Sequence, residues 1–270
     1  MFQLLQNTFW LLLVLIFSLS CARAPKMKEP KTDEECFNRA MRFYRERNHW
    51  QGIPAFQEVR DKFPLSHYAI LAELRLADLH YFKSEFVEAV HYYEEFKRLH
   101  PSNPHVPYSI FQMGMCYFKQ IESIDRDQTP AKKAANYFEY LIDHNPTNPF
   151  TGKAMGKLKI CRKKIFEHEF YIGNFYYKTK KYLAAKERFL TILTQHPYAR
   201  EKDKVLFYLG QTYQHLNEKD KARDTLFTLI ENYPQSEYSA QAKLLLGLSL
   251  ESEEKDKLGT MQDKKQFIIF

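Results

Sequence analysis

Five prolines divide the hydrophobic pattern of this chain into similar segments. They are Pro64, Pro101, Pro146, Pro197 and Pro234. Twelve residues before each proline stands a small residue, namely Gly52, Ala89, Ala134, Ala185 and Ala222. Eight residues before each proline stands a large apolar residue, namely Phe56, Tyr93, Phe138, Phe189 and Leu226. Because a spacing of four places two side chains on one helical face and proline ends a helix, each segment predicts a helix packed closely on a neighbour.

A second helix is predicted upstream in every segment. Twenty-four residues before four of the prolines stands another small residue, namely Ala40, Ala77, Gly173 and Gly210. In the third segment the corresponding residue, Gly114, stands eight residues further upstream. Each is followed three residues later by a ring: Phe43, His80, Tyr117, Tyr176 and Tyr213. A repeated pair of helices of about 34 residues is the tetratricopeptide pattern. We expect an all-α, tetratricopeptide-repeat superhelical solenoid of five helical hairpins. The expected repeats are 33–66, 67–104, 105–149, 150–200 and 201–236, with a capping helix at 237–253.

The distances between the prolines predict two insertions. Successive prolines are 37, 45, 51 and 37 residues apart. Eight extra residues fall between the helices of the third repeat, around 121–129, where we expect a loop. About fourteen more fall between the third and fourth repeats, in a stretch without proline and rich in helix formers. We therefore expect a long helix from about Thr151 to Lys178.

The first 32 residues predict an exported, lipid-anchored protein. The apolar run Leu11–Phe17 is too short for a permanent membrane span and is typical of a signal peptide over 1–20. A small residue followed by Cys21 is similar to a bacterial lipoprotein cleavage site, with the lipid attached to Cys21. Residues 21–32 would then form the anchor and a flexible tether. Ordinary secretion and an uncleaved anchor remain the alternatives. The charged tail 254–270 ends in the apolar Phe267–Phe270, for which a docking peptide and a frayed end are both open.

Composition excludes several function classes. The chain has 270 residues, 16% aromatic residues, 8 glycines and a net charge of +7, with cations scattered among acids. That pattern does not suit nucleic-acid binding, which needs a concentrated basic face. No phosphate-binding loop, nucleophile motif or metal-ligand spacing is present, so we expect no enzyme, no metal and no cofactor. Besides Cys21 there are Cys36, Cys116 and Cys161; buried free thiols are expected, with one disulfide as the alternative.

Two irregular segments carry a family resemblance. The third-repeat insertion reads Asp125-Arg126-Asp127-Gln128-Thr129, and the long helix carries Glu169-Phe170-Tyr171-Ile172-Gly173 and then Phe175-Tyr176-Tyr177-Lys178, followed by Tyr182 and Ala185–Arg188. With the five repeats from about Glu34 to Leu229, these segments resemble the BamD (YfiO) family of outer-membrane lipoproteins. The resemblance implies a scaffold at the periplasmic face of the outer membrane, in the machinery that assembles β-barrel proteins.

The resemblance also implies partners and contact residues. Family members bind BamA through its periplasmic POTRA domain, which we place at Arg188, Tyr177 and Tyr182. Unfolded outer-membrane β-barrel proteins would contact a groove in the first repeats, with Arg75, Tyr81, Tyr92 and Tyr108; other lipoproteins of the complex are further partners. The alternative for Arg188 is a salt bridge within its own helix or to the fifth repeat. For the insertion loop (Asp125, Arg126 and Asp127) it is a self-capped loop, in which Asp caps a helix and Arg bridges two carboxylates.

Two other kinds of protein would share parts of this pattern. A secretin pilot protein or a cell-wall or division adaptor would share the signal and the repeats, but not the insertion at Asp125–Thr129. A helical module of a cell-wall lytic enzyme would need a separate catalytic domain, for which no residues remain. These functions differ in what binds the protein, and copurification distinguishes them.

Overall fold

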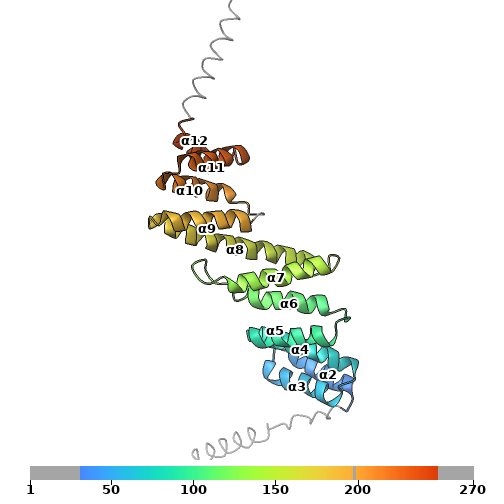
Figure 1. Ribbon diagram of the computed structural model, residues 1–270. Coiled ribbons are helices and arrows are strands. Elements are labelled where there is room, and N and C mark those ends of the chain that lie inside the picture. Colours follow the sequence, from blue (N-terminus) through green and yellow to red (C-terminus); the bar gives the residue numbers. More distant parts are fainter. Residues whose placement is uncertain (1–30, 197–198, 249–270) are drawn as a thin grey trace, which may run out of the picture. The chain divides into compact units, whose positions relative to one another are not determined.

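The computed structural model describes residues 31–196 and 199–248, and every regular element in that part of the chain is an α-helix (Figure 1). The helices are α2 (Asp33–Arg45), α3 (His49–Lys62), α4 (His67–Phe82), α5 (Phe86–Leu99), α6 (Val106–Phe118), α7 (Thr129–His144), α8 (Thr151–Lys178), α9 (Tyr182–Gln195), α10 (Lys202–His215), α11 (Lys219–Asn232) and α12 (Glu237–Leu245). The predicted signal peptide, Cys21, most of the tether, Pro197 and the tail lie outside the described residues. The tetratricopeptide-type fold is confirmed.

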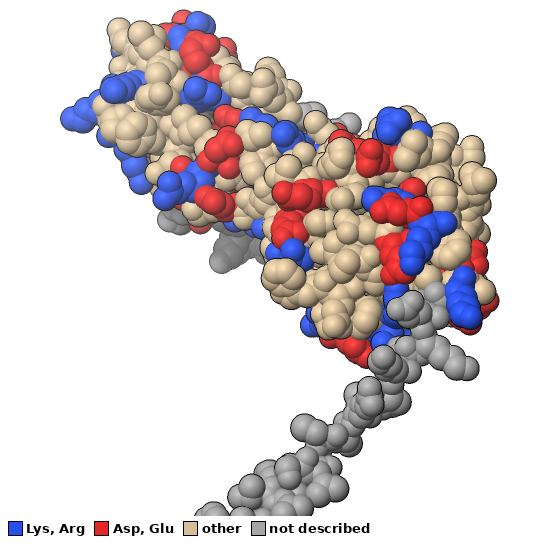
Figure 2. Space-filling view, turned by 90° about the horizontal axis from the view of Figure 1, so that it is seen from below, with Lys and Arg blue, Asp and Glu red and all other residues tan. Residues whose placement is uncertain are grey.

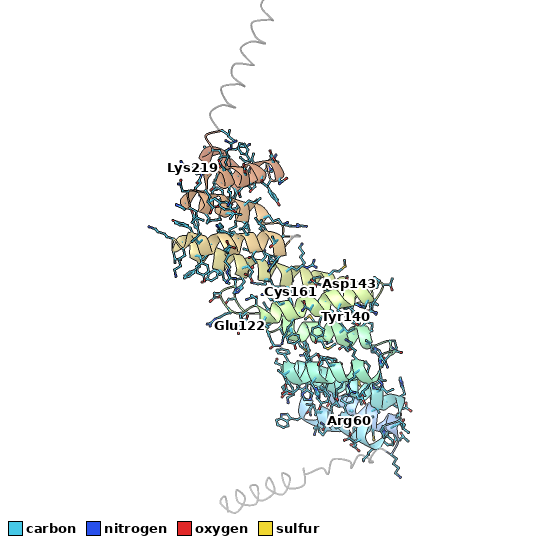
Figure 3. All side chains as sticks on the ribbon, in the orientation of Figure 1. Arg60, Glu122, Tyr140, Asp143, Cys161 and Lys219 are labelled. Carbon is cyan, nitrogen blue, oxygen red and sulfur yellow. The ribbon has the colours of Figure 1, made fainter. Side chains whose placement is uncertain are left out.

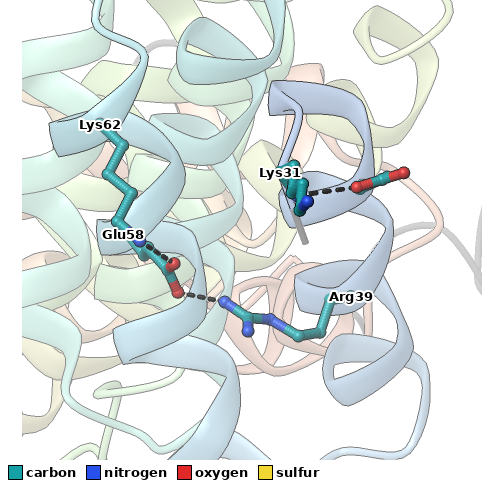
Figure 4. A network of polar contacts seen from close by, with 5 residues as sticks. Lys31, Arg39, Glu58 and Lys62 are labelled. Atoms are coloured by element: carbon teal, nitrogen blue, oxygen red, sulfur yellow. Dashed lines mark hydrogen bonds and ion pairs between the residues drawn. The ribbon is translucent and has the colours of Figure 1, made fainter. Parts of the chain in front are cut away.

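The chain forms two compact units, divided between Leu79 and His80. The first unit contains α2, α3 and most of α4. Its core includes Cys36, Ala40, Phe56 and Val59, each fully buried. On its surface, Arg39 of α2 contacts Glu58 of α3, and Glu58 also accepts a hydrogen bond from Lys62 at 2.7 Å (Figure 4). This ion-pair network joins α2 to α3 at the surface, beside the apolar contact of the two helices.

The second unit shows how the small residues and the rings interlock. The nearest ring atom of Phe138 would lie 2.6 Å from a Cβ placed on Gly114, and that of Phe189 would lie 2.7 Å from one on Gly173. Leu226 stands in the same relation to Gly210, at 2.6 Å. In each repeat the glycine belongs to the first helix and the large residue to the second, so only a residue without a side chain lets the hairpin close so tightly. The predicted packing of these three repeats is confirmed.

Four hairpin turns share one backbone conformation. The residues Arg47, Ser84, Lys180 and Asn217 have φ between 54° and 62°, in the left-handed region. In each turn the next residue donates its N–H to the carbonyl five positions back, as Lys181 does to Tyr176 and Glu218 to Tyr213, both at distances of 3.0 Å or less. This is a Schellman motif, in which glycine or asparagine is preferred. The same backbone therefore recurs with different side chains.

The two predicted insertions are also found. α8 runs from Thr151 to Lys178, as expected, and is the longest described helix. The segment between α6 and α7 is a loop whose carbonyls at Ser123 and Arg126 accept hydrogen bonds from the buried Gln128 amide. On α8, the His168 ring contacts the carbonyl of Ile124 in this loop at 2.6 Å. The loop is therefore fixed from inside by Gln128 and from α8 by His168.

The described part of the chain contains three buried cysteines and a surface of mixed charge. Cys36, Cys116 and Cys161 are buried and form no disulfide with one another, and Cys161 lies where α8 packs along α7 (Figure 3). On the face seen in Figure 2, cationic and anionic side chains lie interspersed, without a single large basic patch. Within residues 31–196 and 199–248, no helix has the length and apolar character that crossing a bilayer requires.

Candidate protein-binding site

Tyr177 and Tyr182 lie together in the second unit. Their ring centroids are 5.9 Å apart, and the Tyr182 ring stacks on His215 at 4.3 Å with an interplanar angle of 8°. The Tyr177 hydroxyl donates a hydrogen bond to Gln211 at 3.1 Å, and burial raises the pKa of this phenol. These contacts hold the rings of α8, α9 and α10 in one half-exposed cluster, which we call the tyrosine cluster (Tyr177, Tyr182 and His215).

Arg188 belongs to a different contact. Its guanidinium lies 3.8 Å from a carboxylate oxygen of Glu169 on α8, while the Lys132 ammonium of α7 lies 3.6 Å from the other oxygen. The alternative of a salt bridge within α9 or to the fifth repeat is wrong, because the partner Glu169 is on the first helix of the same repeat. Six positions separate Tyr182 from Arg188, so the two side chains occupy different faces of α9.

Glu169 is therefore a shared acceptor for two cations. Its side chain is 14% exposed, whereas that of Arg188 is 46% exposed. Near it, burial lowers the pKa of His196, and the Glu169 carboxylate opposes that shift. The arrangement holds Arg188 by one ion pair at 3.8 Å and leaves nearly half of its side chain exposed to solvent.

The residues predicted for the peptide groove are divided between the two units. In the first unit, Arg75 contacts the buried Asp78 carboxylate at 2.6 Å and lies over the Tyr44 ring at 5.6 Å. The Tyr44 hydroxyl donates to the same carboxylate at 3.2 Å, and burial raises the pKa of Tyr44 to about 12. Arg75 thus has an intramolecular role that its position in the sequence did not reveal.

The three tyrosines of the predicted groove belong to the second unit and pack against other rings. Tyr92 stacks on His80 at 4.9 Å, and Tyr81 meets Phe86 edge to face at 5.8 Å. Tyr108 lies 5.3 Å from the Phe150 ring and accepts a hydrogen bond from Gln112. Each ring is held in place and partly exposed. A common groove formed by Arg75, Tyr81, Tyr92 and Tyr108 remains a prediction.

The insertion loop differs from the predicted self-capped form. Asp127 accepts a hydrogen bond from the Thr129 hydroxyl at 3.0 Å and makes no capping bond to α7, whose N-cap residue is Gln128. Arg126 lies 4.0 Å from Asp125, and the Ser123 hydroxyl lowers the pKa of the Asp125 carboxyl. Asp125, Arg126 and Asp127 are all exposed, so the buried Gln128, which sequence reasoning did not single out, holds the loop while the charged side chains face solvent.

The described residues contain no cluster of three or more His, Cys, Asp or Glu side chains arranged to bind a metal ion. Burial raises the pKa of the Cys161 thiol to about 12, which disfavours the nucleophilic thiolate. The described surface carries half-exposed aromatic rings and cations, which are groups that proteins use to bind other polypeptides.

Comparison with known proteins gives a family and several relatives. The profile of the YfiO family, described as an outer membrane lipoprotein, matches residues 29–227. Outer membrane protein assembly factor BamD of Caulobacter vibrioides is 26% identical over 202 residues, which cover 74% of this chain and 66% of that protein. BamD of Neisseria meningitidis serogroup A is 25% identical over 205 residues, covering 72% and 77%.

Solved structures similar to this chain are tetratricopeptide proteins. The TPR2AB domain of yeast Sti1, solved in complex with an Hsp90 peptide, has a TM-score of 0.44 at 16% identity, covering 79% of this chain and 84% of that one. Pseudomonas aeruginosa PilF has a TM-score of 0.36 at 13% identity, covering 80% and 83%. Because the YfiO profile matches well over half of the sequence, the chain belongs to the BamD (YfiO) family of outer-membrane lipoproteins.

Proposed function

We propose that the protein is a lipid-anchored scaffold of the outer membrane that assists the folding and insertion of β-barrel proteins. The observation that carries this proposal is the YfiO profile match over residues 29–227, together with relatives named outer membrane protein assembly factor BamD. Stacked helical hairpins suit the role, because solenoids present extended surfaces for binding other polypeptides. The protein acts by binding and makes no covalent change to its partners.

The anchor is assigned to Cys21, at the periplasmic face of the outer membrane. The support is the apolar run Leu11–Phe17, followed by a small residue and a cysteine. Mass spectrometry of the mature protein provides the test: a first residue Cys21 carrying a diacylglyceryl group is expected. An unmodified Cys21 thiol contradicts the anchor.

The main partner is assigned as BamA, bound through its POTRA domain by Arg188 and the tyrosine cluster. In support, the half-exposed guanidinium of Arg188 keeps donors that a partner carboxylate can use, and the stacked rings offer rigid apolar area. Unfolded barrel proteins would bind at the first repeats. The second unit offers Tyr81, Tyr92 and Tyr108 for this purpose, and in the first unit Arg75 is a candidate cation for a terminal carboxylate. Other lipoproteins of the same complex are further candidate partners.

Binding of the purified POTRA domain to the full chain in detergent tests this assignment. Arg188→Ala is expected to weaken binding by about tenfold, which corresponds to the loss of one charged contact at a partly exposed site. Arg162→Ala is the matched control, because Arg162 is 47% exposed and also pairs with a glutamate, Glu139 at 3.0 Å. Equal binding by the wild type and Arg188→Ala would remove Arg188 from the interface; no binding by the wild type would refute the scaffold proposal itself.

A further inference from the structure

The last third of α8 extends beyond the helix that precedes it. α7 begins level with Glu169, as the Lys132–Glu169 ion pair and the contact of His168 with Ile124 show. α8 then continues to Lys178. On one side of this extension Phe170 and Gly173 pack against Phe189 of α9. On the other side, Tyr171 and Phe175, one helical turn apart, are both about half exposed.

The turn that follows this extension carries an unusual charge. Lys178, Lys180 and Lys181 are exposed, and they make no ion pair, side-chain hydrogen bond or ring contact with the described residues. From Phe170 to Lys186 the sequence contains no acidic residue. Leu183, in the first turn of α9, is 64% exposed. Cations and apolar side chains are thus exposed together at one end of the hairpin.

Two of the three equivalent turns are neutralised by an acid, whereas the first repeat has Arg47 and Asn48 at the positions of Lys180 and Lys181. At the position of Lys181, the second repeat has Glu85, which contacts Lys83 at 2.5 Å, and the fifth has Glu218, which contacts Lys221 at 2.7 Å. At the position of Lys180, the fifth repeat has Asn217, a residue that tolerates the left-handed conformation. The fourth repeat therefore keeps the same backbone with a cation at position 181, where the second and fifth repeats have an acid.

Local structure favours a cation at Lys178, in the last turn of α8, but not at the two lysines that follow. Lys180 has a φ of 59°, which strains a residue with a long side chain. Lys181 is the N-cap of α9 and makes no capping hydrogen bond there, and a cation at a helix N-terminus opposes the helix dipole. Residues that break local rules without a structural compensation mark binding sites.

We propose that these residues form a docking surface, the α8 tip (Tyr171, Phe175, Lys178, Lys180, Lys181 and Leu183), for an acidic segment of a protein partner. Carboxylates of the segment pair with the three lysines, and an apolar side chain of the segment packs against Phe175 and Leu183. The rings follow one face of α8 and the lysines stand at its end, which suits an elongated segment lying along the helix. The inference rests on the proposed function, because the α8 tip continues directly into the tyrosine cluster at Tyr182.

A turn graft tests the proposal. Lys180→Asn with Lys181→Glu reproduces the pair Asn217–Glu218 of the fifth repeat. Because the graft removes strain and an unfavourable charge, the melting temperature is expected to stay level or rise by about 2 °C. Binding of the POTRA domain to the full chain in detergent is expected to weaken by about tenfold, mostly through a slower association rate, with a weaker dependence on salt. A purely structural role would lower stability and leave the salt dependence unchanged.

The control variant is Lys159→Asn with Lys163→Glu, which makes the same change in charge at exposed positions of α8 and is expected to bind like the wild type. If wild type and graft bind the POTRA domain equally, the α8 tip is not a docking surface; if the wild type does not bind it, the proposed function fails first. A photo-crosslinking residue at position 175 in cells gives the second measurement. A crosslink to the barrel subunit supports the proposal, and an adduct with phospholipid alone overturns it in favour of a membrane surface.

Discussion

Gly173 is the most demanding position in the fourth hairpin, because its missing side chain makes room for a fully buried ring. A Cβ at Gly173 would lie 2.7 Å and 3.0 Å from two ring carbons of Phe189, whereas ordinary contacts begin near 3.4 Å. Phe189 is fully buried, and the ring centroids of Phe170 and Tyr208 lie 5.8 Å and 6.2 Å from its own, so its ring moves only by displacing its neighbours. Overpacking of this kind costs about 1–3 kcal/mol.

The same helix provides the control. A Cβ added to Gly156 would meet no side chain or neighbouring helix within 4 Å, so Gly156→Ala is expected to stabilise α8 by about 1 kcal/mol through helix propensity alone. Gly173→Ala gains the same propensity and is opposed by the overpacking against Phe189. The two variants should therefore differ by about 1–3 kcal/mol in unfolding free energy, with Gly173→Ala the less stable.

Urea unfolding followed by circular dichroism measures this difference, and a double-mutant cycle identifies its cause. Phe189→Ala removes the atoms that meet the new methyl group, whereas a leucine would not, since Leu226 stands 2.6 Å from a Cβ on Gly210. Gly173→Ala should therefore cost less beside Ala at position 189 than in the wild type. Equal stability of the Gly156→Ala and Gly173→Ala variants, or an unchanged cost beside Ala at position 189, would refute the packing described here.

Three further predictions follow from the described residues. Phe189→Ala is expected to destabilise the protein by about 3–5 kcal/mol, and an unchanged urea midpoint would contradict its role in the core. Cys36, Cys116 and Cys161 are buried, so iodoacetamide should label them only in urea; rapid labelling of Cys161 in the native protein would show that α8 and α7 open. The hydrogen bond from Lys62, and then the charge of Arg39, lower the pKa of Glu58 below its ordinary value of 4.5. The stability gained from this shift is therefore present above pH 4.5 and is lost as the pH falls below it. The urea midpoint of the wild type should decrease more steeply on acidification than that of Glu58→Gln, and parallel curves would refute the coupling.

The hairpins could be predicted because their packing is local in sequence. Gly173 and Phe189 are sixteen residues apart, and the same pair of a small and a large residue recurs at Gly210 and Leu226. The bounds of α8 followed from a stretch of helix formers without proline, which leaves no residue to end the helix before Lys178.

The site was harder to predict because its contacts join different helices. Nothing in the sequence pairs Arg188 with Glu169, or Tyr182 with His215, until the hairpins are folded. Arg75 was predicted as a peptide contact, yet in the folded chain its guanidinium forms an ion pair with Asp78, one helical turn away. One signal was available: comparing Lys181 with Glu218, 37 residues later, shows that a charge is reversed at an equivalent turn.

Affinity purification of the tagged full chain from detergent-solubilised membranes tests the central claim most directly. A BamA-type barrel subunit with POTRA domains is expected in the eluate in near-equal amount, identified by mass spectrometry, and Arg188→Ala should reduce its recovery while the protein stays folded. Recovery of a secretin or of peptidoglycan in its place, with no barrel subunit, would contradict the assignment to outer-membrane protein assembly.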